Sequence, residues 1–550
     1  MQRIGEIGMR GLAFFSIFIG SLFQYWNLNS DIWFILNSGR YVVDNGIPHT
    51  EPLAMHEGLC YVMEQWLTAV VFWEIYDNFG PSGMIAFTFI VGCAVLYAYY
   101  RLCSFVGNRI IATVMTIVFG VIASRAFFTT RPQILSILIF IGEVFLLEKY
   151  TKTRNWKWLL GLPLVSVLLV NLHSALWPML FVLVLPYIVT YFARRVMSKA
   201  FCPSEYDLSP ILLIGIVSFV VGFCNPYGFE AMSFVFNSYD PAIHNRILEV
   251  QPPMIKTSFG WIFFVVLFGV FFVSARNAMP LQYLLIAMGT GLLGLLASRN
   301  IIFFYFLGTL PVAYGCRNLV LGTHCISVKK LGAITIAGVV VLWHHSVQNI
   351  ALDSIPVVAI LLMSALVICY FCYLCFYRYE GMLLDSKIPQ LRLKYTSGIL
   401  LMLVCFSFFS FYTMHHSKDN GEKQKLIIDF LLRQEKRESI VLWTGFNTGA
   451  YAGFRGIKYY VDARPEVFLP SNTHSAENII GDYFKMTNGI IYYKDFFRDH
   501  KEFTHVLVCP ADGFFFHIIQ HDNDFELMRE EHAPNQEIYR LYRIKRAQKS

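Results

Sequence analysis

Three carboxylates with the chemistry of a general base follow the first apolar stretch of the chain. Asp31, Glu51 and Glu64 lie in a polar segment that is also rich in aromatic residues. A carboxylate there can take a proton from an acceptor hydroxyl or help to hold a divalent metal. Each also has a structural alternative. Asp31 follows Asn29-Ser30 in a cluster typical of helix N-caps, and the two glutamates could be solvated loop residues.

Three arginines stand in turns between apolar stretches and are candidates for binding a phosphorylated substrate. Arg125, Arg131 and Arg299 lie at or just beyond predicted helix ends, on the side of the membrane where positive charge is not favoured. The planar guanidinium suits bidentate contacts with phosphate. The structural alternative is that these side chains extend to lipid headgroups.

Three further polar residues are expected on the same side. Asn171 and His173 stand in one short turn and offer hydrogen bonds to phosphate or sugar, although His173 could equally be a satisfied interfacial histidine. Asn225 precedes Pro226, a pair that would break a helix and turn backbone groups towards a cavity. A purely structural turn is the alternative for Asn225.

No sequence motif specifies a nucleotide or a metal. The chain has no P-loop, no GxGxxG after a strand, no HExxH and no zinc-like Cys/His spacing. Cys369, Cys372 and Cys375 lie in an apolar stretch and are interpreted as packing residues. Acidic ligands for a divalent cation are present, but their spacing selects none. The net charge of +7 is spread over short loops, so we expect no nucleic-acid partner.

A bundle of membrane helices must position these residues. Of the 550 residues, 56% are hydrophobic and 15% are charged, whereas soluble domains carry about a quarter charged residues. Thirteen apolar stretches are predicted to span a bilayer. They are 11–28, 82–100, 110–124, 132–148, 158–171, 174–193, 209–224, 258–275, 279–297, 301–315, 331–345, 355–377 and 397–414.

The distribution of basic residues predicts the orientation of this α-helical polytopic protein. The most basic loops fall on one side, which the positive-inside rule assigns to the cytoplasm together with the N-terminus. An odd number of spans then places the C-terminal region outside, as expected for a protein of a bacterial plasma (inner) membrane.

Three regions are predicted along the chain. Residues 1–320 would form a catalytic transmembrane module with an outer loop over 29–80, and residues 321–415 would add further transmembrane helices. Residues 416–550 alternate helix-like and strand-like segments, which indicates an extracytoplasmic α/β domain. The expected strands are 439–443, 458–461, 504–509 and 537–544, and the expected helices are 418–438 and 482–499.

The order of several short motifs resembles a bacterial group of multi-pass proteins similar to the GT-C glycosyltransferases. Protein O-mannosyltransferases and the aminoarabinose transferase of lipid A are relatives in fold. The motifs are Asp31-Ile32-Trp33, Gly46-Ile47-Pro48, Trp66-Leu67, Arg131-Pro132, Asn171-Leu172-His173, Asn225-Pro226-Tyr227-Gly228, Gln251-Pro252-Pro253, Arg299, Gly449-Ala450-Tyr451 and Asp462-Ala463-Arg464.

This resemblance implies a GT-C-like fold and an inverting sugar transfer from a polyprenyl-phosphate donor. The acceptor, a glycan, lipid or protein, would lie on the outer side, and Asp31 matches the position of the catalytic acid. Two departures stand out. Phe34 follows Trp33 where the group continues with Trp and His, and Glu64 stands one position from the usual acid, which turns a helical side chain by about 100°.

Several points stay open from the sequence. Asp462 and Arg464 match the late Asp-x-Arg of the group, and either a salt bridge that holds the outer domain or a substrate contact would explain them. Two other functions compete with sugar transfer. A transporter or flippase of lipid-linked glycans would need charges deep within spans, where Glu143 is the main example. A non-enzymatic envelope assembly protein would use the α/β domain to bind a partner.

Overall fold

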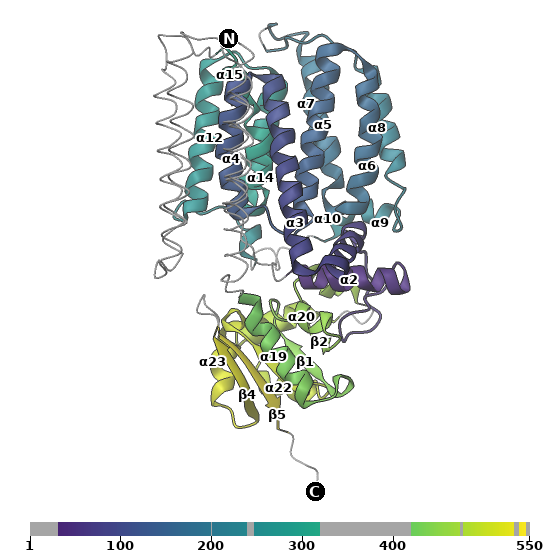
Figure 1. Cartoon of the computed structure of the whole chain (residues 1–550), viewed down its shortest axis with the longest axis vertical. Helices are drawn as coiled ribbons and strands as arrows, with labels where there is room; N and C mark the ends of the chain where they lie inside the picture. Colours follow the sequence, from purple (N-terminus) through teal and green to yellow (C-terminus); the bar gives the residue numbers. More distant parts are fainter. Residues whose placement is uncertain are drawn as a thin grey trace, which may run out of the picture.

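The computed structural model describes residues 31–199, 201–238, 247–318, 420–473, 477–532 and 538–545. Helices of the N-terminal part run alongside one another as a bundle, and the C-terminal domain lies at one end of it (Figure 1). The predicted spans 11–28, 331–345, 355–377 and 397–414 lie outside the described residues. The count of thirteen spans therefore stays a prediction.

The described bundle is built from apolar helices that follow the predicted spans 82–315. The main helices are α3 (Trp66–Val106), α4 (Arg109–Ala126), α5 (Gln133–Thr153), α6 (Gly161–Leu172), α7 (Trp177–Ala193), α8 (Ser209–Val221), α12 (Ser258–Arg276), α13 (Leu281–Leu296), α14 (Ile301–Phe303) and α15 (Leu310–Gly315). Short 3₁₀ turns, η2 (Ser174–Leu176), η3 (Leu248–Val250) and η4 (Ser298–Asn300), connect some of them.

The exterior of this bundle is suited to lipid. Three helical segments, Trp66–Val106, Ser174–Ala193 and Phe259–Arg276, are long and apolar enough to cross a membrane. On α8, Leu213 and Ile216 are each 63% exposed, which would be costly for side chains of this size in water but not in hydrocarbon. The protein is therefore a membrane protein.

Helix α3 begins well before its predicted span. It covers 41 residues, equivalent to about 60 Å of straight helix. Gly80 adopts φ +64° inside it and precedes Pro81, so the helix changes direction there. The segment is thus two helices that meet at this kink, and the first of them, which starts at Trp66, lies before the predicted span.

Helix α2 (Ile32–Asn45) lies across the domain-facing end of the bundle (Figure 1). Its apolar residues Ile32, Ile35 and Leu36 are fully buried. Gly39 allows α2 to cross α3 closely, because a Cβ there would lie 2.0 Å from the carbonyl oxygen of Ala69. This crossing fixes α2 against the bundle.

Five strands form the sheet of the C-terminal domain, in the order β2-β1-β3-β5-β4. Strand β1 pairs in parallel with β2 and β3, whereas β5 pairs antiparallel with β3 and β4. The bounds are β1 (Val441–Thr444), β2 (Lys458–Tyr459), β3 (His505–Val508), β4 (Phe525–His532) and β5 (Ile538–Ile544). The helices are α19 (Asn420–Gln434), α20 (Gly449–Phe454), α21 (Ile479–Thr487), α22 (Tyr493–Asp499) and α23 (Gly513–Ile518).

The α/β fold predicted for this domain is confirmed, but several of its elements differ from those expected. Strand β4 was not predicted, because Glu526, Arg529 and the acids after them are typical of a polar loop. The strand lies next to β5 and forms one edge of the sheet. The helix expected over 482–499 is two helices. Gly489 separates them in a left-handed conformation at φ +75°.

Candidate functional site

An ion-paired cluster of three residues lies at the domain-facing end of the bundle. Arg131, in the turn before α5, binds Asp31 at 2.5 Å and Glu249 at 2.6 Å with its two terminal nitrogens. Asp31 stands at the N-cap of α2, yet its side chain makes no capping bond there. Burial lowers the pKa of Arg131, but the charges of Asp31 and Glu249 outweigh this and raise it. The guanidinium is therefore a permanent cation between two carboxylates.

Short contacts connect this cluster to the turn that carries Arg299. Gln133, two residues after Arg131, donates a hydrogen bond to the Arg299 carbonyl at 2.9 Å. On the other side, Ser298 donates from its amide (2.9 Å) and its hydroxyl (2.8 Å) to the carbonyl of Gln251. Two of the three predicted arginines therefore lie on connected turns, with the Arg299 side chain exposed.

His173 is held as a neutral hydrogen-bonding group. Its Nδ1 shares a hydrogen bond of 2.9 Å with the hydroxyl of Ser136 on α5. Burial and then the nearby charge of Arg299 lower the pKa of His173 to about 3. His173 thus offers an imidazole without positive charge near the exposed residue Arg299.

Glu64 is placed beside His173 by the backbone. Its carbonyl accepts a hydrogen bond of 2.8 Å from the amide of Ser174. Burial, and then the charge of Glu466, raise the pKa of Glu64 to about 8, although Arg299 and the amide of Ala175 act in the opposite direction. Glu64 therefore carries its proton at neutral pH, which makes it a hydrogen-bond donor and a poor base.

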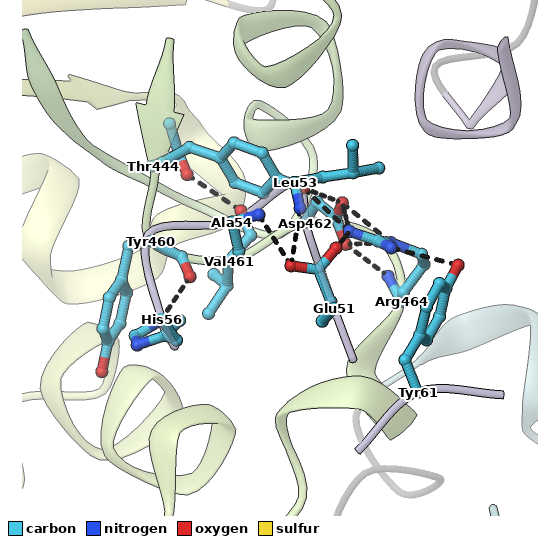
Figure 2. Close-up of polar contacts among 11 residues, drawn as sticks. Glu51, Leu53, Ala54, His56, Tyr61, Thr444, Tyr460, Val461, Asp462 and Arg464 are labelled. Carbon is cyan, nitrogen blue, oxygen red and sulfur yellow. Dashed lines mark hydrogen bonds and ion pairs between the residues drawn. The ribbon is translucent and has the colours of Figure 1, made fainter. Parts of the chain in front are cut away.

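Glu51 lies in a buried joint between the first loop and the C-terminal domain (Figure 2). It forms an ion pair of 2.9 Å with Arg464 and accepts hydrogen bonds from the amides of Leu53 (3.0 Å) and Ala54 (2.7 Å). Arg464 also binds Asp462 at 2.7 Å. These contacts are structural, unlike the catalytic role expected for Glu51. Of the two alternatives for Asp462 and Arg464, the structure contains the salt bridge.

The two predicted asparagines make hydrogen bonds within turns. Asn171 accepts from the indole of Trp66 at 2.9 Å and donates to the carbonyl of Cys224 at 2.9 Å. Asn225 donates to the carbonyls of Gly222 and Gly228 at 2.7 and 3.0 Å. Both amides are therefore used to hold the bundle end together. The side chain of Arg125 lies outside the described part of the chain.

Two acids of the site were not among the predicted site residues. Glu249 precedes a Pro-Pro turn in a connection between helices, and nothing local distinguishes it from a solvated loop residue. Glu466 follows the Asp-x-Arg motif in η7 (Pro465–Phe468), a region that the sequence left without a role. Glu249 becomes visible only when the fold brings it into contact with Arg131, 118 residues earlier, and Glu466 only through the effect of its charge on the pKa of Glu64.

Comparison with solved structures identifies the architecture. An oligosaccharyltransferase of Archaeoglobus fulgidus, tethered with an acceptor peptide, superposes with a TM-score of 0.51 at 10% identity, over 97% of this chain and 74% of that one. Apo ArnT of Cupriavidus metallidurans gives 0.51 at 11% identity, over 98% of each chain. The chain has the GT-C glycosyltransferase fold.

A second structure of ArnT, bound to undecaprenyl phosphate, matches this GT-C chain with a TM-score of 0.50 at 10% identity, over 97% of each chain. No protein-family profile matches the sequence, and no curated protein does. At this level of identity the comparisons establish the GT-C fold, which is the fold that the motif order predicted.

Proposed function

We propose that the protein is an inverting membrane glycosyltransferase that uses a polyprenyl-phosphate sugar and acts at the domain-facing end of its bundle. That end would be the extracytoplasmic face. The observation that supports the proposal is the cluster Asp31–Arg131–Glu249 at the bundle end that also carries Arg299 and His173. The fold is shared with an enzyme bound to undecaprenyl phosphate and with one tethered to an acceptor peptide.

In this proposal Asp31 is the general base. Its carboxylate takes the proton of an acceptor hydroxyl while the acceptor oxygen bonds to the anomeric carbon and the bond from that carbon to the phosphate oxygen breaks. Arg131 orients Asp31, because the salt bridge of 2.5 Å holds one carboxylate oxygen of Asp31. Arg299 supplies the cation for the leaving phosphate, with His173 as a neutral hydrogen-bond partner.

No step is assigned to a metal. Among the residues that the structure describes, no group of three or more His, Cys, Asp or Glu side chains is arranged to hold one. The carboxylate of Asp31 is engaged by Arg131 instead. The chemistry proposed for the described residues is acid–base catalysis and charge stabilisation.

Replacing Asp31 tests this function directly. Asp31→Asn should lower the transfer of label from radioactive polyprenyl-phosphate sugars to membrane acceptors by about 10²-fold or more, because the base is lost. Asp44→Asn, at the exposed far end of the same helix, is the matched control and should keep full activity. Full transfer activity of the Asp31→Asn variant would show that Asp31 is not the general base. If the wild-type protein transfers sugar from none of the polyprenyl-phosphate donors tested, the proposed function is wrong.

A transport function remains the second candidate because of one observation. Glu143 is fully buried on α5, and neither carboxylate oxygen has a hydrogen-bond partner among the described residues. A lone acid at such a position is typical of transport pathways in membranes. Glu143→Gln should leave sugar transfer unchanged if the protein is a transferase. If it is a flippase, the same change should stop translocation of a fluorescent lipid-linked glycan in vesicles.

A further inference from the structure

Asp31 and Glu249 share one guanidinium, but the two carboxylates lie in different surroundings. The Nη2 atom of Arg131 binds Asp31 at 2.5 Å, and its Nη1 atom binds Glu249 at 2.6 Å. The side chains of Arg131 and Asp31 are 25% and 23% exposed, whereas that of Glu249 is 53% exposed. An ion pair with an exposed partner contributes little to stability, because water solvates that partner when it leaves. Glu249 is therefore the partner that can be exchanged.

The charge of this cluster disfavours an anionic ligand while Glu249 is in place. Two carboxylates surround one guanidinium, so the cluster has one negative charge in excess, and a phosphate is repelled by it. Departure of the Glu249 carboxylate would leave the neutral pair of Asp31 and Arg131, with the Nη1 atom available to a phosphate oxygen. The Nε atom of Arg131 also has no hydrogen-bond partner among the described residues, so the guanidinium has an unused donor.

The backbone that follows Glu249 is fixed, so the exchange needs a movement of its side chain alone. The carbonyl of Gln251 accepts two hydrogen bonds from Ser298, one from the amide (2.9 Å) and one from the hydroxyl (2.8 Å). The carbonyl of Met254 accepts two from Thr257 in the same manner, at 3.0 and 2.8 Å. Rotation about the side-chain bonds of the glutamate is enough to withdraw its carboxylate.

The same connection presents apolar side chains at the bundle end. Met254 and Ile255 are exposed, and so is Trp261 in the first turn of α12. Exposed side chains of this kind in a membrane protein suit the lipid interface, where tryptophan is common. A phosphate carried on a polyprenyl chain is confined to that interface. Glu249 therefore lies on a connection that a lipid-linked phosphate can approach.

We propose that the carboxylate of Glu249 holds the position of the substrate phosphate on Arg131 and is exchanged for it in each reaction cycle. This inference rests on the proposed transfer function. When the donor binds, its phosphate takes the Nη1 atom of Arg131 and the Glu249 side chain turns into solvent. When the product leaves, Glu249 returns to the same nitrogen.

The return of Glu249 assists product release. The donor is a phosphodiester with one negative charge. In the transfer step the bonding pair of the broken bond stays on the phosphate oxygen, and the acceptor proton passes to Asp31. The product is then a phosphate monoester, which carries about 1.5 to 2 negative charges at pH 7. It therefore binds a guanidinium more tightly than the donor does, and competition by Glu249 offsets this difference.

Binding of undecaprenyl phosphate tests the exchange without any transfer step. The lipid is titrated into the full-length protein in nanodiscs of neutral lipid, and tryptophan fluorescence gives the Kd. Glu249→Gln should lower this Kd about three- to fivefold, because a competing anion is lost while the size of the side chain is kept. Glu74→Gln is the matched control and should leave the Kd unchanged, since Glu74 is an exposed acid of the α3 segment that packs on α2.

Two further measurements identify the partners of the exchange. Undecaprenol has the same chain without the phosphate, and its Kd should be equal in the wild type and in Glu249→Gln. Arg131→Gln should weaken the binding of undecaprenyl phosphate. Addition of Glu249→Gln to that variant should bring no gain, because the nitrogen for which the two anions compete is absent. Thermal melting of each variant checks that it is folded.

Transfer assays test the role in product release. Added undecaprenyl phosphate should inhibit Glu249→Gln at a concentration about three- to fivefold lower than that for the wild type. The initial rate, measured before product accumulates, should change less than twofold. A side chain that only supports Arg131 would instead lower the initial rate and leave the inhibition constant unchanged.

The outcomes separate this proposal from the proposed function. An unchanged or higher Kd for undecaprenyl phosphate in Glu249→Gln overturns the exchange. An equal gain in Glu74→Gln, with undecaprenol, or in the absence of Arg131 also overturns it, because the effect is then not competition for one nitrogen. If the variants bind as expected but the wild type transfers no sugar, the proposed function and the role in product release are wrong, whereas the phosphate site on Arg131 is supported.

Discussion

At the scale of single residues, the site combines carboxylates in three different environments. Asp31 is ion-paired and partly exposed, Glu51 is buried in a salt bridge, and Glu64 is half-buried, with a buried Oε2 atom that has no hydrogen-bond partner among the described residues. These environments suit three different tasks, which we propose to be general base for Asp31, structural ion pair for Glu51 and hydrogen-bond donor for Glu64. Residue type alone could not separate them.

The protonation of Glu64 makes the stability of the fold depend on pH. Its pKa of about 8 in the folded protein exceeds the ordinary value of 4.5, so the folded state binds the proton more tightly. Stability is fully present below about pH 4.5 and is lost as the pH rises through 8, at about 1.4 kcal/mol per pH unit at most. The melting temperature should fall from pH 5 to pH 8.5, and Glu64→Gln should flatten this decrease.

Glu57→Gln serves as the control, because Glu57 is exposed in the same loop. Differential scanning fluorimetry in detergent gives the melting temperatures. A Glu64→Gln variant whose melting temperature depends on pH as steeply as that of the wild type would contradict the assignment.

Sequence reasoning expected several of these residues on one side of the bundle but not their partners, and their roles in the site stay predictions. Asp31, Arg131 and His173 were predicted at the bundle end that the structure shows, because short motifs beside apolar stretches locate them. The ion pair of Arg131 with Asp31 spans 100 residues, and that with Glu249 spans 118. No periodicity carries such information, since the contacts depend on how the helices pack. The same reason explains why Glu51 was expected in the site.

At the scale of elements, α2 connects the C-terminal domain with the helix bundle. Trp33 packs against Tyr451 and Phe454 of α20, with ring centroids 4.9 and 5.1 Å apart, and Arg40 donates to the carbonyl of Phe454 at 2.9 Å. On its other side Gly39 touches α3. The position of Asp31 therefore follows from the packing of one short helix between domain and bundle.

Enlarging Gly39 should disturb that helix. In Gly39→Ala the new methyl group overlaps the carbonyl of Ala69, so we expect a loss of about 1–3 kcal/mol in stability and reduced transfer activity. Gly142→Ala on α5 is the control, because no atom lies within 4 Å of its added Cβ and alanine favours the helix. Melting temperatures and transfer rates of both variants measure the effect. If the Gly39→Ala and Gly142→Ala variants are equally stable, α2 can move relative to α3 without loss of stability.

At the scale of the whole molecule, the buried contacts around Arg464 hold the membrane module and the C-terminal domain together as one unit. Its charges are buried, so removal of one partner leaves another uncompensated. The domain therefore depends on the loop for its position, and the loop on the domain.

Loss of Arg464 should separate the two parts. Arg464→Met removes the cation and leaves Glu51 and Asp462 facing each other, at a cost of about 3–5 kcal/mol. We expect a lower melting temperature and faster proteolytic release of the C-terminal domain. Arg498→Met, at an exposed ion pair with Asp495, should change neither. Unaltered proteolysis of Arg464→Met would contradict the role of the joint.

The placement of α2 also defines what can be exchanged between proteins that share this fold. The helix carries Asp31 at one end and packs on α20 of the domain along its length, and the hairpin of residues 50–60 is bonded to the same domain. In a chimera that exchanges the C-terminal domain alone, the surface of the new domain would not match the helix α2 that carries Asp31. Residues 31–61 and the C-terminal domain would therefore have to be exchanged together, although more than 350 residues of sequence lie between them.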